Sequence, residues 1–472
     1  MSIERLPDDV LLEIFDHHRL AAPDYSLLEP WEWHRLAHVC KRWRNVIFES
    51  PRRLNLRLVF TYRKPVRNTL DCWPPLPLSI WYPRSVLHDT LSPADEENVI
   101  AALEYPDRIC EINLTLTRPL SERLAPPMQS PFPVLEDLQL GSRDMVESLI
   151  LPSGFLGEST PRLRRINLDG TPFPSLPRLL VTAIDLVFLR LHEIPSTGYF
   201  SPESLVTGLD ATPRLRFLEI YFVHPTPLSG QIIPDTYPQT RVALRDLTEF
   251  QFRGDNEYLE DLIARIDAPN IEQFNATLFD RLTFELPQLA EFIGRTEELV
   301  SSPQRMSIWL WAPRFSITHY FGLPPSPRAA FRLQMHCSDF SRQLTLLAHI
   351  CRQLSLLVAD VERLDMEANS IVSHWPGEID DTQWLELLAS FSGVRRLELI
   401  GTLIPHVASA LERSAGNTPV GQGGEGEVEV LPSLRDLHLR GTLFSSSVES
   451  FVATRQHPDR VVSVRYTEDE EP

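Results

Sequence analysis

The segment Pro161-Arg-Leu163-Arg-Arg-Ile166-Asn-Leu168 decides how most of this chain folds. Its apolar residues follow the spacing apolar-x-x-apolar-x-apolar, and the second half alternates as a short, half-buried strand does. Segments of similar sequence begin at Pro213 and Pro432. A proline just before an expected strand suits a turn or the first position of that strand. The segment therefore predicts one unit of a repeat that contains a short strand.

The same spacing recurs along most of the chain. It is present at Ile109/Ile112/Leu114, Leu135/Leu138/Leu140, Leu163/Ile166/Leu168, Leu186/Leu189/Leu191, Leu215/Leu218/Ile220, Leu247/Phe250/Phe252, Ile271/Phe274, Val361/Leu364/Met366, Val394/Leu397/Leu399 and Leu434/Leu437/Leu439. We expect two further units in the poorly patterned middle, near Ile308 and Leu333. The units follow one another at about 30 residues, with wide scatter, and such a period is typical of stacked repeats.

Return segments between the strands should complete each unit, and several of them have helical patterns. The expected helices are 201–209, 258–266, 286–295, 338–357 and 382–391. The units resemble leucine-rich repeats of irregular form, because they lack the usual asparagine or cysteine after the strand and vary more in length. We expect an α/β fold, a solenoid with a parallel sheet on its concave side and helices or loops outside. An ordinary α/β domain whose strands share a motif is the alternative.

The extent of the repeat and the composition of the segments around it indicate the domain boundaries. Residues 1–50 form a helical module, and residues 51–104 form a connector rich in proline and aromatic residues, or a first cap of the solenoid, with a short strand near Phe60. The repeat domain covers residues 105–465, with a glycine-rich loop inserted at 414–428, and an acidic tail covers 466–472.

The N-terminal module carries more apolar surface than so short a segment can easily bury. Pro7 suits the first position of a helix, and the apolar residues from Val10 to Phe15 follow a helical period. A second helix should run from Trp33 to Ile47, through Cys40. An excess apolar patch usually marks a partner site, although a cap on the next domain is the alternative.

The order of particular residues in this module resembles the F-box motif. The residues that carry the resemblance are Leu6, Pro7, Ile14, Phe15, Val39, Cys40, Trp43 and Arg44. The resemblance implies binding to the Skp adaptor and, through it, to a cullin of a ubiquitin ligase. Within the F-box family, the chain resembles fungal members. By that resemblance the adaptor-binding residues would be Leu6, Pro7, Leu11, Ile14, Phe15, Val39, Cys40 and Trp43. The segment from His17 to Glu32 is longer than is usual between the helices.

Composition narrows the class of protein further. The net charge of −19 disfavours nucleic acid and anionic membranes as partners. The five cysteines are scattered and form no CxxC pair, which indicates reduced thiols rather than disulfides or a zinc site. We find no signal peptide and no apolar run of roughly 18 residues that could cross a membrane. These features predict a cytoplasmic or nuclear protein.

Lysine is scarce, because Lys41 and Lys64 are the only lysines among 45 cationic residues. Codon bias in a GC-rich genome would explain this composition. Alternatively, a ligase component that is nearly free of lysine would resist modification of itself. Composition alone does not separate the two explanations.

We find no catalytic signature, phosphate loop or metal-ligand pattern, so we expect no enzyme activity, cofactor or metal. The aromatic cluster at 308–321 could be core, or Trp309 and Trp311 could be anchors for a target protein on the strand face. Several arginines near the strands could bind an acidic or phosphorylated target. Alternatively, these arginines are simply exposed to solvent. The candidates are Arg164, Arg190, Arg216 and Arg395 (or Arg396).

Together these observations predict a substrate receptor of a Skp–cullin–F-box ubiquitin ligase. The N-terminal module would bind the adaptor, and the repeat domain would bind a target that the sequence does not identify. A repeat scaffold unrelated to ubiquitin is the main alternative, and an enzyme with an unrecognised site is the other.

Overall fold

A computed structural model describes residues 6–20, 32–50, 54, 56–62, 65–82, 91–142, 150–225, 241–280, 285–296, 299, 305–311, 313–321, 328–368, 380–416, 430–441, 446–455 and 462–467. The chain divides into two compact units, each described by itself. Unit 1 comprises residues 1–200 and 207–212, and unit 2 comprises residues 201–206 and 213–472. No described helix is long and apolar enough to cross a membrane.

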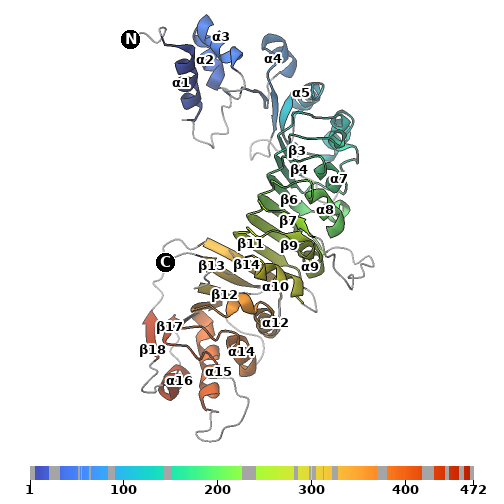
Figure 1. Ribbon diagram of the computed structural model, residues 1–472. Helices are drawn as coiled ribbons and strands as arrows, with labels where there is room; N and C mark the ends of the chain where they lie inside the picture. The colour runs from blue at the N-terminus through green and yellow to red at the C-terminus, as the bar shows by residue number, and fades with distance from the viewer. Residues whose placement is uncertain are drawn as a thin grey trace. The chain divides into compact units, whose positions relative to one another are not determined.

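Unit 1 begins with three helices and continues as a parallel sheet (Figure 1). The helices are α1 (Asp8–Leu20), α2 (Glu32–Val39) and α3 (Lys41–Glu49). The strands, which pair in chain order, are β1 (Leu58–Phe60), β2 (Leu78–Tyr82), β3 (Ile109–Leu116), β4 (Asp137–Ser142), β5 (Arg165–Asp169) and β6 (Phe188–Ile194). The connections contain α4 (Val66–Cys72), α5 (Pro93–Leu103), α6 (Arg118–Leu124) and α7 (Leu176–Leu180), and α8 (Pro202–Leu209) crosses the boundary between the units.

Unit 2 contains the larger part of the main sheet, whose strands are mostly parallel. Its strand order is β7 (Phe217–Phe222), β9 (Glu249–Gly254), β11 (Gln273–Leu278), β14 (Arg328–His336), β13 (Arg314–Phe321), β12 (Arg305–Trp311), β15 (Arg363–Ala368), β16 (Arg396–Ile400), β17 (Asp436–Arg440) and β18 (Ser463–Thr467). The helices are α9 (Asn256–Ala264), α10 (Pro287–Gly294), α12 (Phe340–Gln353), α13 (Ser355–Val358), α14 (Asp381–Ala389), α15 (Ile404–Gly416) and α16 (Ser446–Arg455). A separate pair joins β8 (Val242–Ala243) to β10 (Ile266–Asp267).

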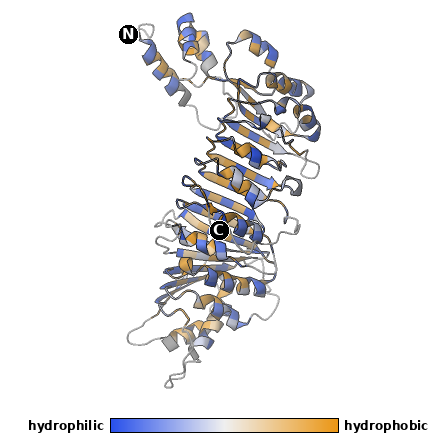
Figure 2. Cartoon of the chain, turned by 45° about the vertical axis from the view of Figure 1, so that its right-hand side comes forward, coloured by the Kyte–Doolittle hydropathy of each residue, from blue (hydrophilic) through white to orange (hydrophobic). Residues whose placement is uncertain are grey.

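Apolar residues in register form the core of each unit. In unit 1, Ile112, Leu138 and Ile166 lie side by side on neighbouring strands, and each side chain is fully buried. In unit 2, the ring of Phe274 lies 5.4 Å from that of Phe250. Burying one such side chain stabilises the fold by about 1.5 to 3 kcal/mol. The alternate residues of the strands face away from this core, and Figure 2 shows the resulting stripes of apolar and polar residues.

The strand predictions are confirmed for all ten segments. The last apolar residues of each segment lie within a strand, in β3 to β7, β9, β11 and β15 to β17. In nine of them the first apolar residue lies just before the strand and is fully buried, as Leu163 and Leu215 are. The predicted short strand near Phe60 is β1. The expected helices correspond to α8, α9, α10, α12 with α13, and α14.

The two further units expected near Ile308 and Leu333 are present as strands β12 and β14, but they are not neighbours in the sheet. Strands are present at both places, but β13 pairs antiparallel with β12 on one side and with β14 on the other. The chain therefore enters this region beside β15 rather than beside β11, and it returns to β11 only with β14. Antiparallel neighbours need only short connections, and only residues 312–313 and 322–327 lie between these three strands in the sequence.

Two predicted segments lie mostly outside the described residues. Helix α15 extends to Gly416, so the first residues of the loop expected at 414–428 are helical, and residues 417–429 are outside the described part. Strand β18 includes Tyr466 and Thr467, the first two residues of the expected acidic tail, and residues 468–472 are outside the described part.

A buried histidine lies in the antiparallel part of unit 2. His319 of β13 pairs in register with Met306 of β12 and Phe331 of β14, and its side chain is only 1% exposed. Neither ring nitrogen has a hydrogen-bond partner in the part of the chain that the structure describes. Burial lowers the pKa of His319 to about 4, because the charged imidazolium is disfavoured in apolar surroundings.

His319 should therefore make the protein less stable in mild acid. In the unfolded chain the imidazole takes up a proton below its ordinary pKa of about 6.5, whereas the folded protein keeps it neutral down to about pH 4. Lowering the pH from 7 to 5 should cost about 2 kcal/mol of unfolding free energy through this residue alone. Urea unfolding at the two pH values, compared between the wild type and His319→Leu, measures the contribution. An identical loss in both proteins would contradict the assignment.

Candidate functional site

The three N-terminal helices pack around a small apolar core. Leu11 and Phe15 of α1, Ala37 of α2 and Ile47 of α3 are buried, with exposed fractions of 2% or less. The rings of Phe15 and Trp43 lie 4.8 Å apart between their centroids. Such a contact between α1 and α3 fixes the angle at which the two helices meet.

The single helix expected from Trp33 to Ile47 is in fact two helices, which is a correction to the sequence prediction. α2 ends at Val39, and α3 begins at Lys41. Cys40 between them has extended backbone angles and is the N-cap of α3, where its Sγ accepts a hydrogen bond from the Trp43 amide at 3.4 Å. A side chain that satisfies an amide at a helix start favours a break, which the apolar periodicity does not report.

An arginine connects the start of α1 to α3. Arg42 donates from Nη2 to the carbonyl oxygen of Leu6 at 2.5 Å, and the same guanidinium pairs with Asp8 at 2.6 Å. The pair with Asp8 is exposed and contributes little to stability by itself. The contact nevertheless fixes the Leu6–Asp8 segment beside the beginning of α3, and thus near the end of α2.

Several apolar residues of the module remain exposed. Val10 and Ile14 are 41% and 40% exposed, and Val39 is 59% exposed. Pro7, Val10 and Ile14 follow the spacing i, i+3, i+7 and therefore share one face of α1. Cys40 is exposed next to Val39. We call Pro7, Val10, Ile14, Val39 and Cys40 the exposed apolar set.

The structure separates the predicted adaptor-binding residues into two groups. Pro7, Ile14, Val39 and Cys40 are exposed, whereas Leu11 and Phe15 are buried in the module core. Leu6 and Trp43 are half-buried. The prediction omitted Val10, although its spacing of i+3 from Pro7 and i−4 from Ile14 places it on the same face.

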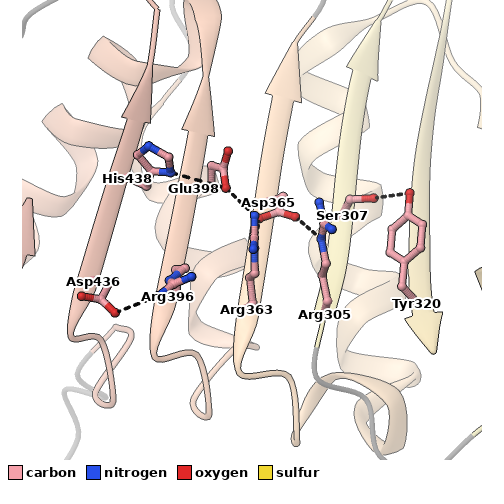
Figure 3. Close-up of polar contacts among 9 residues, drawn as sticks. All are labelled: Arg305, Ser307, Tyr320, Arg363, Asp365, Arg396, Glu398, Asp436 and His438. Atoms are coloured by element: carbon pink, nitrogen blue, oxygen red, sulfur yellow. Dashed lines mark hydrogen bonds and ion pairs between the residues drawn. The ribbon is translucent and has the colours of Figure 1, made fainter. Parts of the chain in front are cut away.

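The open face of the unit 2 sheet carries a row of charged residues across four strands (Figure 3). Asp365 of β15 and Glu398 of β16 are neighbours in register and are only 6% and 8% exposed. Arg363 joins them, with Nε 2.9 Å from Asp365 Oδ1 and Nη2 2.6 Å from Glu398 Oε2. We call these residues, with the flanking Arg305 and His438, the Arg363 network.

The flanking residues extend this network in both directions. Nε of Arg305 on β12 lies 2.5 Å from Asp365 Oδ2, and the guanidinium lies over the ring of Tyr320. On the other side, Nδ1 of His438 on β17 lies 3.6 Å from Glu398 Oε2. Burial lowers the pKa of Arg363, but hydrogen bonds to the two carboxylates outweigh burial and raise it overall. The alternation of apolar and polar residues predicts that the side chains of the Arg363 network point away from the core. Only the register between the strands brings these side chains together.

A similar cluster lies on the open face of unit 1. Arg57, just before β1, reaches Glu111 through Nη1 and Glu136 through Nη2, each at 3.2 Å. Nearby Asp137 lies 3.6 Å from Arg165. Burial raises the pKa of Asp137 to about 6, against the hydrogen bond from Gln139 that favours its charged form. These arginines bind carboxylates of the chain itself, so they are already neutralised.

The arginines predicted to bind a target occupy two kinds of position in the fold. Arg164, Arg216 and Arg395 lie just before their strands, at exposed positions. In all three, the carbonyl oxygen accepts hydrogen bonds from two successive amides at the start of the next strand. Arg190, in contrast, lies within β6, where Nη2 is 3.5 Å from Nδ1 of His192. Arg395 pairs with Glu362 at 3.2 Å.

The predicted aromatic anchors lie on the open face of β12. Trp309 is 46% exposed, and Trp311, two residues further on, is half-buried on the same face. In register, Trp309 lies between Ser316 of β13 and Glu367 of β15. The inward residues Ile308 and Leu310 supply the core contacts of this strand. Core packing thus explains the alternate residues of the cluster and leaves Trp309 with exposed ring surface.

The described residues contain no group of three or more His, Cys, Asp or Glu that could hold a metal ion. All five cysteines are free. Burial raises the pKa of the Cys110 thiol to about 11 and that of Cys351 to about 12, so neither provides a reactive thiolate near neutral pH.

Comparison with protein families assigns the N-terminal module. Residues 3–57 match the family model described as F-box-like, and this range contains α1, α2, α3 and the exposed apolar set. The chain therefore carries an F-box-like domain, whose relatives typically serve as adaptors rather than enzymes. A search of curated proteins finds no match to the chain.

Proposed function

We propose that this protein is a substrate receptor of a Skp–cullin–F-box ubiquitin ligase. The observation that carries the proposal is the exposed apolar set on an F-box-like domain. Exposed valine and isoleucine side chains gain free energy when a partner removes them from water. The buried Leu11 and Phe15 and the half-buried Trp43 would hold the helices at the angles that the adaptor requires.

The receptor would contribute geometry rather than covalent chemistry. One end of the chain would bind the Skp-type adaptor and, through it, the cullin. The other end would hold a target so that its lysines lie close to the conjugating enzyme. Holding two reactants together raises their effective concentration, which accelerates transfer without any catalytic residue on the receptor.

We infer that the strand repeat is an irregular leucine-rich-repeat solenoid and that its open face holds the target. The repeated strand-entry hydrogen bonds at Arg164, Arg216 and Arg395 support equivalent units. Trp309 supports the choice of face, because an exposed tryptophan on a rigid strand is a typical binding anchor. The paired arginines of both open-face clusters favour a target that buries apolar surface over one that relies on phosphate groups.

The experiment that tests the proposal is reconstitution of the complex. The full chain is co-expressed with a Skp-type adaptor and analysed by size-exclusion chromatography, and a cullin is then added. We expect a stoichiometric complex with the adaptor and recruitment of the cullin only when the adaptor is present. A folded chain that binds neither protein would instead favour a scaffold unrelated to ubiquitin.

Replacing Trp309 by alanine should weaken target binding and leave adaptor binding unchanged. Truncation of a tryptophan anchor typically costs about 2 kcal/mol or more of binding free energy, or about 30-fold in affinity. Proximity labelling in cells, with and without residues 1–50, identifies candidate targets as proteins that accumulate around the truncated chain. Labelling of the same proteins is then compared between the truncated chain and its Trp309→Ala variant. Leu356→Ala is the matched control, because Leu356 is 52% exposed but lies on helix α13. Equal loss of targets from both variants would contradict the assignment of this face.

A further inference from the structure

The extent of the lysine depletion exceeds what codon composition alone explains. The codons of lysine, isoleucine and phenylalanine all begin with two A or T bases, so a GC-rich genome should deplete all three. The chain nevertheless contains 25 isoleucines and 23 phenylalanines beside its two lysines. Isoleucine is also easy to replace, because valine in its place is usually tolerated in cores. Lysine, which is ordinarily among the commonest residues, is therefore depleted far more strongly than the other residues with such codons.

The geometry of ion pairs explains only some of the arginines. Arg57 and Arg363 each use two guanidinium nitrogens to hold two different carboxylates, and Arg123 does so with Glu96 and Glu97. A lysine has a single nitrogen at the end of its side chain and could not bridge such pairs in the same way. At these positions arginine is the better structural choice.

Other arginines have no structural reason to differ from lysine. Four of them are exposed and form no hydrogen bond or ion pair through the side chain with the part of the chain that the structure describes: Arg162, Arg178, Arg245 and Arg435. At such positions a lysine would provide the same charge and solubility. What it would add is a primary amine.

That amine is the chemical difference that matters beside a ubiquitin ligase. In ubiquitin transfer, a neutral lysine amine attacks the thioester carbonyl that links ubiquitin to a cysteine of the conjugating enzyme. An amide bond forms, the carbon–sulfur bond breaks, and the cysteine leaves as a thiol with the proton that the amine releases. The arginine guanidinium stays protonated, with a pKa above about 12, and cannot serve as this nucleophile.

We propose that the body of the chain, from residue 65 onward, is a lysine-free surface that keeps ubiquitin off the receptor and directs transfer to the bound target. This inference rests on the proposed function. It confines side-chain acceptors to Lys41 and Lys64. Lys41 is exposed at the first residue of α3, directly after Cys40 of the exposed apolar set, so a bound adaptor would lie beside it. Lys64 lies outside the described residues.

The test restores amines to the body without altering its charge. In a reconstituted ligase with Skp-type adaptor, cullin, conjugating enzyme and ubiquitin, the wild-type chain is compared with a variant that carries Arg162→Lys, Arg178→Lys, Arg245→Lys and Arg435→Lys. These positions span both units, so transfer does not depend on one location. We expect about tenfold more ubiquitin per chain on the variant, because its amines are held near the thioester at high effective concentration.

A second variant with glutamine at the same four positions separates the amine from the loss of arginine. It should be modified no more than the wild type. Adaptor and cullin binding are measured for every protein by size-exclusion chromatography, so a failure of the proposed function is recognised as absent binding. If all proteins bind, equal modification of the wild type and the lysine variant, whether high or absent, would overturn the inference.

Discussion

Replacing Val10 and Ile14 by aspartate is expected to abolish binding of the Skp-type adaptor. Both side chains are about 40% exposed on one face of α1, so the charges enter water in the free protein and the module remains folded. In a complex the same carboxylates would be buried without a partner, which is strongly unfavourable. We expect the affinity to fall by about 100-fold or more. Isothermal titration calorimetry with purified adaptor measures the loss.

The matched control places the same charges on an unrelated exposed apolar pair. Val181 and Ile184, near the end of α7, are 50% and 54% exposed. Val181→Asp with Ile184→Asp should leave adaptor binding within about twofold of the wild type, since surface substitutions away from an interface rarely matter. Equal weakening by both pairs would mean that charge, and not the face of α1, determines binding.

Trp43 is a less informative position for this test. Its ring packs against Phe15 in the module core, so Trp43→Ala would remove a core contact as well as any contact with the adaptor. Loss of binding by this variant could then result either from disrupted packing of α1 on α3 or from a lost contact with the adaptor, and the measurement would not separate the two. The sequence pattern alone does not distinguish these roles, because a buried and an exposed apolar residue both match a motif.

The sequence predicts the strands well because each one carries its own signal. Leu163, Ile166 and Leu168 face one core, and a period of two is visible within a single unit. The helix break at Cys40 has no comparable apolar signal, since it depends on one thiol that accepts an amide hydrogen bond. Local alternation thus predicts elements, while single polar contacts determine where they end.

The candidate site was predictable only in part, for a related reason. The motif spacing indicates the N-terminal module, and helical geometry adds Val10 to its exposed face. The Arg363 network, by contrast, includes contacts between strands whose residues are 35 or more positions apart, and only the register of β12, β15 and β16 aligns these residues. The antiparallel strand β13 changes which strand lies beside β15, and no spacing pattern in the sequence predicts this change of strand order.

Replacing Arg363 by alanine is expected to destabilise unit 2 by about 2 to 3 kcal/mol, since removing one partner of a nearly buried network leaves charges uncompensated. Asp365 and Glu398 would remain side by side, 6% and 8% exposed, and among the described residues Arg305 and His438 would be their remaining ion-pair partners. Arg363→Lys should recover about half of the loss, because one ammonium cannot pair fully with both carboxylates. Urea unfolding followed by tryptophan fluorescence measures the differences.

Two further variants isolate the electrostatic cause of that loss. Combining Arg363→Ala with Asp365→Asn and Glu398→Gln removes the uncompensated charges and should restore most of the stability, although each substitution alone leaves an imbalance. Arg332→Ala on β14 is the control, because Arg332 is exposed, and such a surface change should cost less than about 0.5 kcal/mol. A penalty that the triple substitution leaves unchanged would show that Arg363 stabilises the sheet through packing of its aliphatic stem.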